Sequence, residues 1–409
     1  MTSFLNIPSK GINKSYSDLI TDLNRLESIP KILHTNDEYE IYLSILAAAC
    51  NGNNIVLTDS GLTKFELLEL GINDENVNSV NHKRYSEIAN PTALLERIKN
   101  EEWSLTLFTS GTTGKPKSVT HKISSFLRSV KIGQKFENNV WGLCYHPTHI
   151  AGINVFFQAL FNLNQIVFLF DLPKDGIRKQ LRENHITHLS ATPSFYRQLL
   201  PSSEVFETVL YVTSGGERYD EKLTDELKKI FVNAKFRNIY ASTEAGTIFT
   251  GDGDNFRVKE DSLNLLKIVE NKLFLHRSLL GASENLICEG DWYDSGDIVE
   301  VINTSPMTIR FVSRQNDFVN IGGFKVNPLE VEEILRSHPG VVNARVFGKK
   351  NSVLGNILVA EIQPESKAIF EERELREFLR LRVQEYKIPR MFIMVEELEM
   401  TRTGKISRK

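Results

Sequence analysis

Short apolar runs alternate with helix-like segments through most of the first 250 residues. An apolar helix-like stretch at 41–50 is followed by the turn NGNN and by the strand-like run IVLTD at 55–59. Similar strand-like runs are WSLTLF, QIVFLF, THLSATP, VLYVTSGG and KFRNIYAST, with helical candidates such as 174–184 and 220–232 between them. Strands that are buried on both faces and joined by helical crossovers have this pattern. We therefore expect a mixed α/β fold with largely parallel sheets.

The pattern changes near Phe256 to hairpin-like β structure. The segment KIV-EN-KLFLH at 267–276 predicts a hairpin, and the runs DIVEVI and TIRFVS predict further strands. The predicted elements after Arg314 are a strand, a helix at 328–336, strands at 343–348 and 357–363, a long helix at about 370–386, and a strand at 391–398. This order is typical of a small α+β domain of about a hundred residues.

Composition and charge exclude several classes of protein. A chain of 409 residues, 41% of them hydrophobic, suits two or three globular domains. The net charge of −3 argues against a nucleic-acid binder, which needs a clustered positive surface. Cys50, Cys144 and Cys288 lie far apart without CxxC spacing, so we expect no disulfide or zinc site, and a cytoplasmic protein.

No membrane span or secretory signal is expected either. The longest uncharged stretch, 152–170, is interrupted by asparagines and glutamines, and predicts a buried helix followed by a strand. The first residues lack the charged and apolar regions of a signal peptide.

The most informative stretch is LTLFTSGTTGKPKSVTH at 105–121. A strand runs into a loop that combines glycines, hydroxyl side chains and two lysines. Glycines allow backbone N–H groups to turn toward an anion, while hydroxyls and lysines add hydrogen bonds and charge. The spacing is not that of a Walker A loop, which disfavours a kinase or GTPase. A generic GTTG could be a solvated turn, but the loop as a whole is suited to a polyphosphate.

The complete string TSGTTGKPK resembles the signature loop of the acyl-adenylate-forming (AMP-binding) superfamily. Four further segments resemble family motifs in the same order: YASTE at 240–244, YDSGD at 293–297, RQNDFVNIGGFKVNPLEVE at 314–332, and TRTGKISRK at 401–409. Read alone, YDSGD is a turn with a capping aspartate, and Lys405 is a solvated lysine. Five ordered matches over Thr109 to Lys405 favour the family reading, with members that include acyl- and aryl-CoA ligases.

The resemblance implies a division of the chain and a reaction. It implies a large AMP-binding domain at 1–313 of β-α-β subdomains plus a barrel-like one, a hinge at 314–316 centred on Asn316, and a small mobile lid at 317–409. It also implies that a carboxylate attacks the α-phosphorus of ATP, releasing pyrophosphate, and that the acyl-adenylate then reacts with a thiol. ATP, Mg²⁺ and CoA, or a phosphopantetheine carrier, are the expected cofactors and substrates.

The resemblance also carries roles onto individual residues. Lys405, Thr243 and Glu244 would act in catalysis, with Glu244 holding Mg²⁺ and Asp297 accepting the ribose hydroxyls. The residues implied to surround ATP are Thr109, Ser110, Gly111, Thr112, Thr113, Gly114, Lys115, Lys117, Gly215, Gly216, Glu217, Tyr240, Ala241, Ser242, Asp297 and Arg314.

A third set of residues is expected to border the acyl group. His149 and Gly152 resemble the family's H-x-x-G element, and Thr192 begins another matching segment; a packed core histidine is the alternative for His149. No acidic residue occurs between Val140 and Phe170, which disfavours an α-amino acid substrate. Uncharged aromatic residues in this region suggest an apolar acid, aryl or fatty, with simple core packing as their alternative role: Phe156, Phe157, Phe195 and Tyr196.

Three substitutions and a short N-terminal region depart from the family pattern. Asn316 replaces the usual aspartate at the hinge, and Ser118 and Ala241 replace glycines. Only 108 residues precede the phosphate loop, so we expect a trimmed N-terminal region, which favours a homodimer or a short, open acyl channel. The leading interpretation is a CoA ligase; the alternatives are a ligase that loads an acyl-carrier protein and a degenerate nucleotide-binding module.

Overall fold

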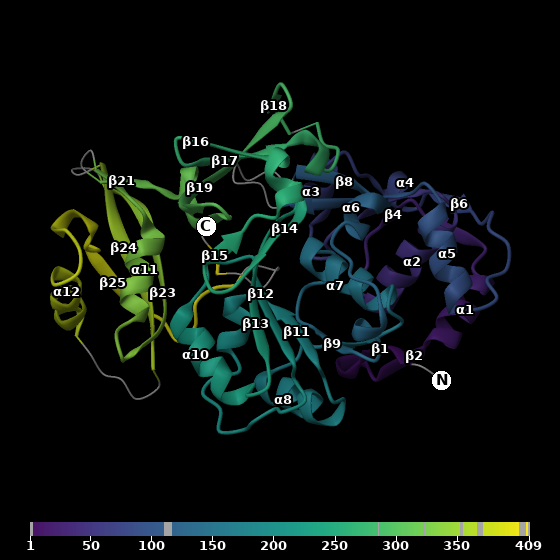
Figure 1. The fold of residues 1–409 in the computed structure, drawn as a ribbon, viewed down its shortest axis with the longest axis horizontal. Helices are drawn as coiled ribbons and strands as arrows, with labels where there is room; N and C mark the ends of the chain where they lie inside the picture. The colour runs from purple at the N-terminus through teal and green to yellow at the C-terminus, as the bar shows by residue number, and fades with distance from the viewer. Residues whose placement is uncertain are drawn as a thin grey trace. The chain divides into compact units, whose positions relative to one another are not determined.

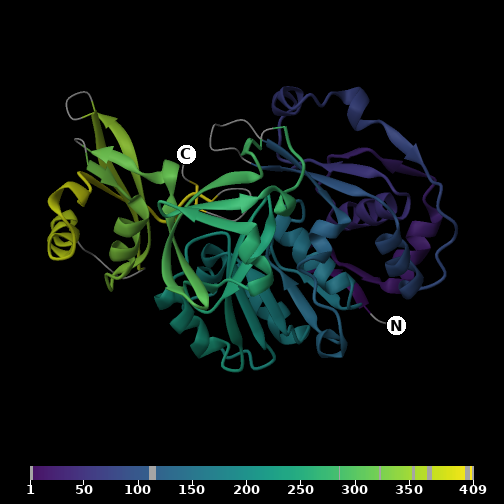
Figure 2. The same cartoon turned by 45° about the horizontal axis from the view of Figure 1, so that its top comes forward.

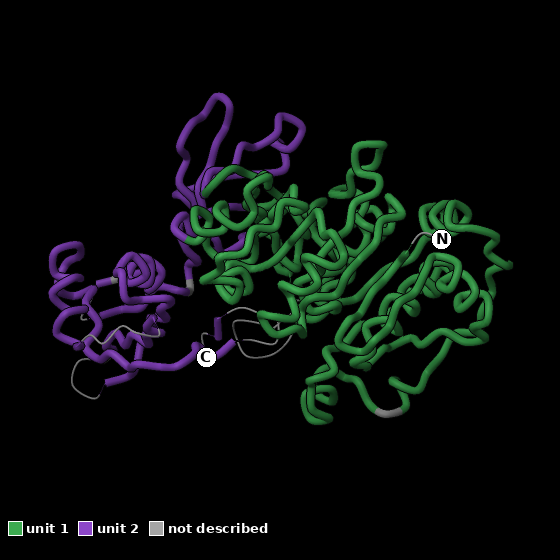
Figure 3. The backbone as a smooth tube through the Cα atoms, turned by 90° about the horizontal axis from the view of Figure 1, so that it is seen from below, with its two compact units in different colours: residues 1–219, 223–253, 275–293 green, residues 220–222, 254–274, 294–409 purple. Residues whose placement is uncertain are grey.

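The computed structural model describes residues 3–109, 117–284, 286–321, 324–351, 355–365, 371–400 and 406–407, with positions 74, 109, 316, 325 and 355 described by their backbone alone. The chain forms two compact units (Figure 3). Unit 1 comprises residues 1–219, 223–253 and 275–293, and unit 2 comprises 220–222, 254–274 and 294–409.

Unit 1 is built around an eight-stranded sheet, which we call the main sheet (Figure 1). Its strands are β1 (Ser3–Ile7), β2 (Ile12–Ser15), β9 (Val140–Leu143), β10 (Gln165–Phe168), β11 (His188–Ala191), β12 (Tyr211–Gly215), β13 (Lys235–Ser242) and β14 (Gly246–Gly251), in the order β14-β13-β12-β11-β9-β10-β1-β2. All neighbours from β13 to β1 are parallel, and only the outer strands β14 and β2 are antiparallel. The expected parallel α/β fold is confirmed.

Side chains of alternate residues in the main sheet enter two different cores. Ile166 and Phe168 of β10 join a core with helices α1 (Tyr16–Arg25), α2 (Glu38–Cys50) and α7 (Ile150–Leu160). Val167 joins the opposite core, with α8 (Lys174–Glu183) and α10 (Glu221–Ile230). Strand side chains alternate between faces, so a continuous apolar run is what a strand covered on both sides requires.

A second sheet of unit 1 has the order β4-β5-β7-β8. Its strands are β4 (Ile32–Leu33), β5 (Asn54–Leu57), β7 (Ser104–Thr109) and β8 (Lys117–Lys122). β7 and β8 are antiparallel, with Thr109 opposite Lys117. The connection between these two strands, 110–116, lies outside the described residues.

The remaining short elements of unit 1 lie outside these two sheets; Figure 2 shows the fold from a second direction. They are α3 (Lys64–Glu69), α4 (Asp74–Val77), α5 (Pro91–Asn100), α6 (Ile123–Leu127), α9 (Pro193–Arg197), and the two-stranded pair β3 (Ser28–Pro30) and β6 (Val80–His82).

The change of pattern near Phe256 marks a six-stranded sheet, most of it in unit 2. Its strands are β15 (Asn255–Arg257), β16 (Leu266–Val269), β17 (Lys272–His276), β18 (Cys288–Glu289), β19 (Trp292–Thr304) and β20 (Met307–Arg314), in the order β15-β20-β19-β17-β16 with β18 beside β19. The predicted hairpin at 267–276 is confirmed. Its turn residues Glu270 and Asn271 have φ of 49° and 64°, as a tight two-residue hairpin turn requires.

The C-terminal part of unit 2 is the expected small α+β fold. It contains β21 (Val319–Ile321), β22 (Phe324–Val326), α11 (Pro328–Arg336), β23 (Val341–Asn351), β24 (Gly355–Pro364), α12 (Glu372–Arg380) and β25 (Met391–Met394), with the sheet order β23-β24-β25. The prediction that the long helix continues to residue 386 is wrong, because α12 ends at Arg380. The chain turns there so that Ile388 is buried and β25 pairs in parallel with β24.

Candidate functional site

Several predicted site residues of unit 1 follow the carboxyl ends of parallel strands. The stretch with His149 and Gly152 follows β9, Thr192 follows β11, and Gly216 and Glu217 follow β12. Carboxyl ends of neighbouring parallel strands meet at one edge of a sheet, where ligands of α/β proteins commonly bind. The fold therefore brings motifs that are distant in sequence to a common edge.

Two consecutive glycines at the end of β12 are required for different structural reasons. A Cβ atom at Gly215 would lie 2.9 Å from the carbonyl oxygen of Ile239 on the neighbouring β13. Gly216 has φ +80°, a left-handed conformation that side chains other than glycine disfavour. Together they let the chain leave the sheet edge directly at Glu217.

Glu217 connects the ends of β12 and β11. Its carboxylate accepts the Ser194 backbone N–H at 2.9 Å and the Ser194 hydroxyl at 2.8 Å. Thr192 is 1% exposed and accepts the Phe195 N–H at 3.1 Å, capping the N-terminus of α9. The carboxylate therefore binds a backbone N–H of the first turn of α9, which has no acceptor within the helix.

The YASTE motif forms the end of β13 and the turn into β14. Tyr240 lies in β13 with its ring 5.4 Å from that of Phe249, and a register irregularity separates it from Ala241. The Ser242 hydroxyl oxygen accepts the Ala245 N–H at 3.2 Å, which closes the turn that carries Thr243 and Glu244.

Three consecutive carbonyl groups of that turn are held from elsewhere in unit 1. The Thr243 oxygen is 2.7 Å from His121 Nε2, the Glu244 oxygen accepts the Gly281 N–H at 2.7 Å, and Arg128 Nη2 donates to the Ala245 oxygen at 2.6 Å. Since a carbonyl can only accept, the imidazole of His121 must carry its proton on Nε2. These bonds fix the backbone around Glu244.

Sequence reasoning missed His121 and Arg128. His121 is 1% exposed, and its burial lowers the pKa of the imidazole, with Arg128 acting in the same direction. Neutral His121 is thus the form that holds the turn. The available signal was the alternation along β8, which places His121 on the same face as the buried Val119.

The predicted acyl-pocket residues have clear local roles. His149 precedes α7, and its Nδ1 accepts the Ala151 N–H at 3.3 Å, while its ring stacks on Tyr145 at 6.2 Å. A Cβ atom at Gly152 would meet the His146 carbonyl oxygen at 2.7 Å, so the close approach requires glycine. Hydrophobic residues considered for this pocket lie in the two cores of the main sheet: Phe156, Phe157, Phe195 and Tyr196.

Unit 2 brings two other predicted residues together. Asp297 of β19 is 1% exposed and lies opposite Arg314 of β20. Arg314 Nε donates to Asp297 Oδ1 at 3.0 Å. Asn316 follows in a 3-10 turn at 315–317, with its side chain outside the description.

Part of the predicted site lies outside the described residues. This applies to Ser110, Gly111, Thr112, Thr113, Gly114, Lys115 and Lys405, and to the side chain of Thr109. Lys117 is described as the first residue of β8, half-buried, where the loop ends. The proposed roles of these residues remain predictions.

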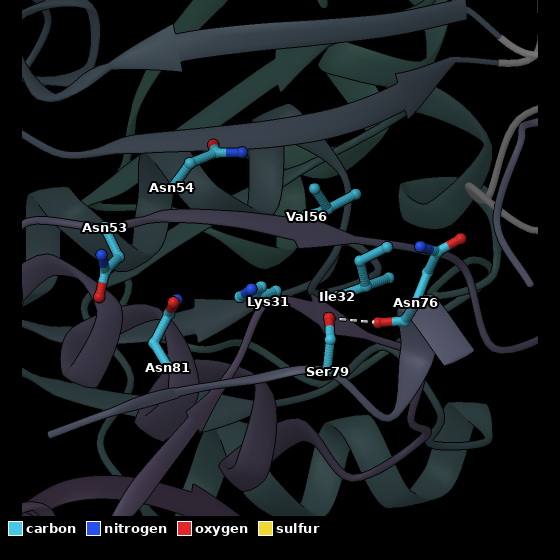
Figure 4. A pocket seen from close by; sticks show the side chains of 8 residues that line it. All are labelled: Lys31, Ile32, Asn53, Asn54, Val56, Asn76, Ser79 and Asn81. Carbon is cyan, nitrogen blue, oxygen red and sulfur yellow. Dashed lines mark hydrogen bonds between the residues drawn. The ribbon is translucent and has the colours of Figure 1, made fainter. Parts of the chain in front are cut away.

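A cavity elsewhere in unit 1 contains none of the predicted site residues. Its volume is about 500 Å³, and Figure 4 shows its lining of Lys31, Ile32, Asn53, Asn54, Val56, Asn76, Ser79 and Asn81. The Ser79 hydroxyl donates to the Asn76 carbonyl there at 2.7 Å. The cavity has no carboxylate, histidine or cysteine in its lining, so we assign it no chemistry.

Comparison with known proteins identifies the family. The profile of the AMP-binding enzyme matches residues 40–264, more than half of the chain. The chain belongs to the AMP-binding enzyme family. The profile of the C-terminal domain of AMP-binding enzymes also matches, at residues 330–405. The resemblance inferred from the motifs is thereby confirmed.

Relatives of this AMP-binding enzyme include CoA ligases. A 4-coumarate–CoA ligase-like protein of Arabidopsis thaliana is 22% identical, over 97% of this chain and 76% of its own length. The 2-succinylbenzoate–CoA ligase of Listeria monocytogenes is 26% identical, over 77% of this chain and 71% of its own length. The predicted enzyme class, an acid–thiol ligase of the AMP-binding family, is confirmed.

Solved structures support the predicted fold. The o-succinylbenzoate CoA synthetase of Bacillus subtilis, bound to its acyl-adenylate, superposes with a TM-score of 0.74 at 18% identity, covering 99% of this chain and 94% of that one. ATP-bound MatB of Rhodopseudomonas palustris gives 0.75 at 17% identity, with the same coverage. The adenylate-forming enzyme fold is confirmed.

Within the described ranges, no helix is long and apolar enough to cross a membrane. Nor do the described His, Cys, Asp and Glu residues form a group of three that could hold a metal ion.

Proposed function

We propose that this enzyme activates a carboxylic acid with ATP, releases pyrophosphate from an acyl-adenylate, and transfers the acyl group to the thiol of CoA. Family membership and the run of CoA ligases among its relatives support the reaction class. The observation that carries the proposal is the clamped turn at 243–245, beside the strand end that carries Gly216 and Glu217.

The clamped turn suits a nucleotide-bound Mg²⁺. Such an ion is usually bound by one or two carboxylates together with substrate phosphates and water, so a group of three protein ligands is not required. Glu244 supplies a carboxylate whose backbone is fixed by hydrogen bonds from His121, Gly281 and Arg128. When bound, the ion would neutralise charge on the phosphate oxygens.

In the first step, the substrate carboxylate displaces pyrophosphate from the α-phosphorus. Negative charge accumulates on the phosphate oxygens, and preorganised cations and N–H groups lower the barrier. We assign Lys405 and the loop at 109–117 to this stabilisation, and Thr243 to a phosphate contact. Asp297 would accept the ribose hydroxyls, with its position set by Arg314. No enzyme nucleophile is needed, because the reaction is an in-line displacement.

In the second step, the thiolate attacks the acyl carbonyl and AMP leaves. Lys405 would obstruct this attack if it stayed where the first step needs it. We therefore propose that the C-terminal domain, 317–409, rotates about a hinge at 314–316, with Asn316 as the pivot. Asparagine tolerates unusual backbone angles, so it can serve in place of aspartate.

The substrate we propose is an aryl or fatty acid. The segment from Val140 to Phe170 contains no acidic residue to pair with an α-ammonium group. His149, Gly152 and Thr192 lie on the loops that follow β9 and β11, which places them at the sheet edge as candidates for the acyl site. Relatives named for 2-succinylbenzoate and 4-coumarate favour the aryl class.

The experiment that tests the function is acid-dependent pyrophosphate release. Purified enzyme is incubated with ATP, Mg²⁺ and panels of aryl, short-chain and long-chain acids, with and without CoA. We expect acid-dependent release that turns over many times only with CoA, and an acyl-CoA product by mass spectrometry. Turnover with phosphopantetheinylated carrier protein but not with CoA would contradict the acceptor. Absence of release with every acid would contradict the proposed function itself.

A further inference from the structure

A buried arginine of the C-terminal domain holds the tail that follows Lys405. Arg345 lies in β23, is 7% exposed, and is directly opposite Glu361 of β24. Its Nη2 is 2.6 Å from Glu361 Oε2, and its Nη1 donates to the backbone carbonyl of Ser407 at 2.5 Å. One guanidinium group thus joins the sheet to a residue two positions after Lys405 in the sequence.

The tail is also paired with the chain that precedes it. The Ser407 N–H donates to the Glu399 oxygen at 2.7 Å, and Met400 forms an antiparallel bridge with Ile406. Ser407 is 6% exposed, so its carbonyl needs a partner inside the domain. Both ends of the segment that contains Lys405 are therefore attached to the β23–β24–β25 domain, and Arg345 provides the attachment to the sheet.

Arginine is suited to this task. Its planar guanidinium presents several N–H donors in a fixed fork, which can serve Glu361 and Ser407 at once. Glu361 holds the fork from the other side, and Arg345 also lies over the ring of Phe347 at 5.1 Å. A buried ion pair often contributes little net stability. A positioning role therefore accounts for the Arg345–Glu361 pair in this core better than a stabilising role does.

We infer that Arg345, oriented by Glu361, is a positioning residue for adenylation, because it anchors the tail through which Lys405 reaches the α-phosphate. The inference rests on the proposed function of Lys405. A purely structural role of Arg345 would lower the rates of both half-reactions. A positioning role predicts a loss of rate in the first half-reaction alone, since Lys405 acts only there.

The main test uses the double variant Arg345→Met with Glu361→Met. Removing both charges leaves no unpaired buried ion, and similar replacements of buried ion pairs are tolerated. We expect the kcat of acid-dependent ATP–pyrophosphate exchange to fall roughly 10- to 100-fold, because small misplacements of a catalytic group have effects of that size. The KM for ATP and the rate of thioester formation from supplied acyl-adenylate should stay within about two-fold.

Three controls make the result specific. Lys387→Met removes another ion pair of the same domain, Lys387–Glu330 at 2.7 Å, that involves no tail residue, and should leave exchange unchanged. Arg345→Lys keeps a charge for Glu361 but loses the fork, and should lose exchange to a smaller extent. In a Lys405→Ala background, the double variant should have no additional effect on exchange, since both changes act through the same group.

The outcomes are separable. Wild-type exchange rates in Arg345→Lys and in the folded double variant would overturn the inference, as would equal losses in both half-reactions. Should the double variant not fold, as judged by circular dichroism, the Arg345→Lys result decides alone. Absence of exchange in the wild-type enzyme would instead contradict the proposed function.

Discussion

Arg314 lies directly opposite Asp297 in the β19–β20 ladder and donates through Nε to its carboxylate at 3.0 Å. Asp297 is almost fully buried, whereas the side chain of Arg314 is 45% exposed. The hydrogen bond fixes the orientation of the buried carboxylate, which the proposed acceptor of the ribose hydroxyls requires. Asp297 and Arg314 come from separate sequence motifs, and this hydrogen bond joins them across the β19–β20 ladder.

Replacing Asp297 by Asn should weaken ATP binding. The charged acceptor for the ribose would be lost, and charge-assisted hydrogen bonds contribute about 1.5–3 kcal/mol, so the KM for ATP should rise roughly tenfold or more. Steady-state pyrophosphate release as a function of ATP concentration measures this. The matched control is Glu300→Gln, which removes the pairing partner of Arg310 in the same ladder, where both side chains are exposed. Equal KM values in the two variants would contradict the role of Asp297.

Replacing Lys405 by Ala should separate the two half-reactions. Loss of a cation that stabilises the transition state costs on the order of 10²- to 10³-fold, so acid-dependent ATP–pyrophosphate exchange should nearly disappear. Formation of thioester from synthetic acyl-adenylate and CoA should persist. Lys409→Ala, four positions later in the sequence, serves as the control. Exchange at the wild-type rate in Lys405→Ala would refute the assignment.

Replacing His121 by Phe should disturb the turn that carries Glu244. The Thr243 carbonyl would lose its buried donor, which should lower the free energy of unfolding by about 1–3 kcal/mol. Displacement of Glu244 should also raise the Mg²⁺ concentration needed for half-maximal exchange. Thermal unfolding and a Mg²⁺ titration measure the two effects. His121→Gln retains a donor and should lose less; identical behaviour of the Phe variant and the wild type would show that this hydrogen bond is unimportant.

Stability should fall in mildly acidic solution because of His188. Its ring lies between those of Trp141 and Tyr211 at 4.6 and 4.8 Å, and burial lowers the pKa from 6.5 to about 4. Above pH 6.5 the histidine is neutral in both folded and unfolded chains. As the pH falls from 6.5 toward 4, the unfolded chain takes up a proton that the folded chain does not, so stability decreases.

The matching experiment compares His188→Phe with the wild type by chemical unfolding between pH 4 and 7. The wild type should lose on the order of 2 kcal/mol more than the variant across this range, because phenylalanine keeps the ring stack and does not titrate. His185→Asn, at an exposed neighbouring position, controls for removal of a histidine. Parallel pH dependences of wild type and His188→Phe would contradict the assignment.

The local elements could be read from the sequence because they depend on local patterns. The apolar runs predicted the strands of the main sheet, and the predicted helix at 328–336 matches α11. The end of α12 could not be predicted in this way. Its helix-forming residues continue beyond Arg380, but the chain turns there to bury Ile388 and to pair β25 with β24. Tertiary packing commonly overrides intrinsic helix propensity.

By itself, the sequence determined the parallel α/β architecture, the family and the motifs of the candidate site, since periodicity and motif spacing are properties of neighbouring residues. Only the tertiary structure decided which groups hold those motifs in place: His121 on the carbonyl of Thr243, Glu217 on the first turn of α9, and Arg345 on the carbonyl of Ser407. The physical reason is that buried donors and acceptors must find partners wherever strand register and packing bring distant segments together. No local pattern encodes that choice.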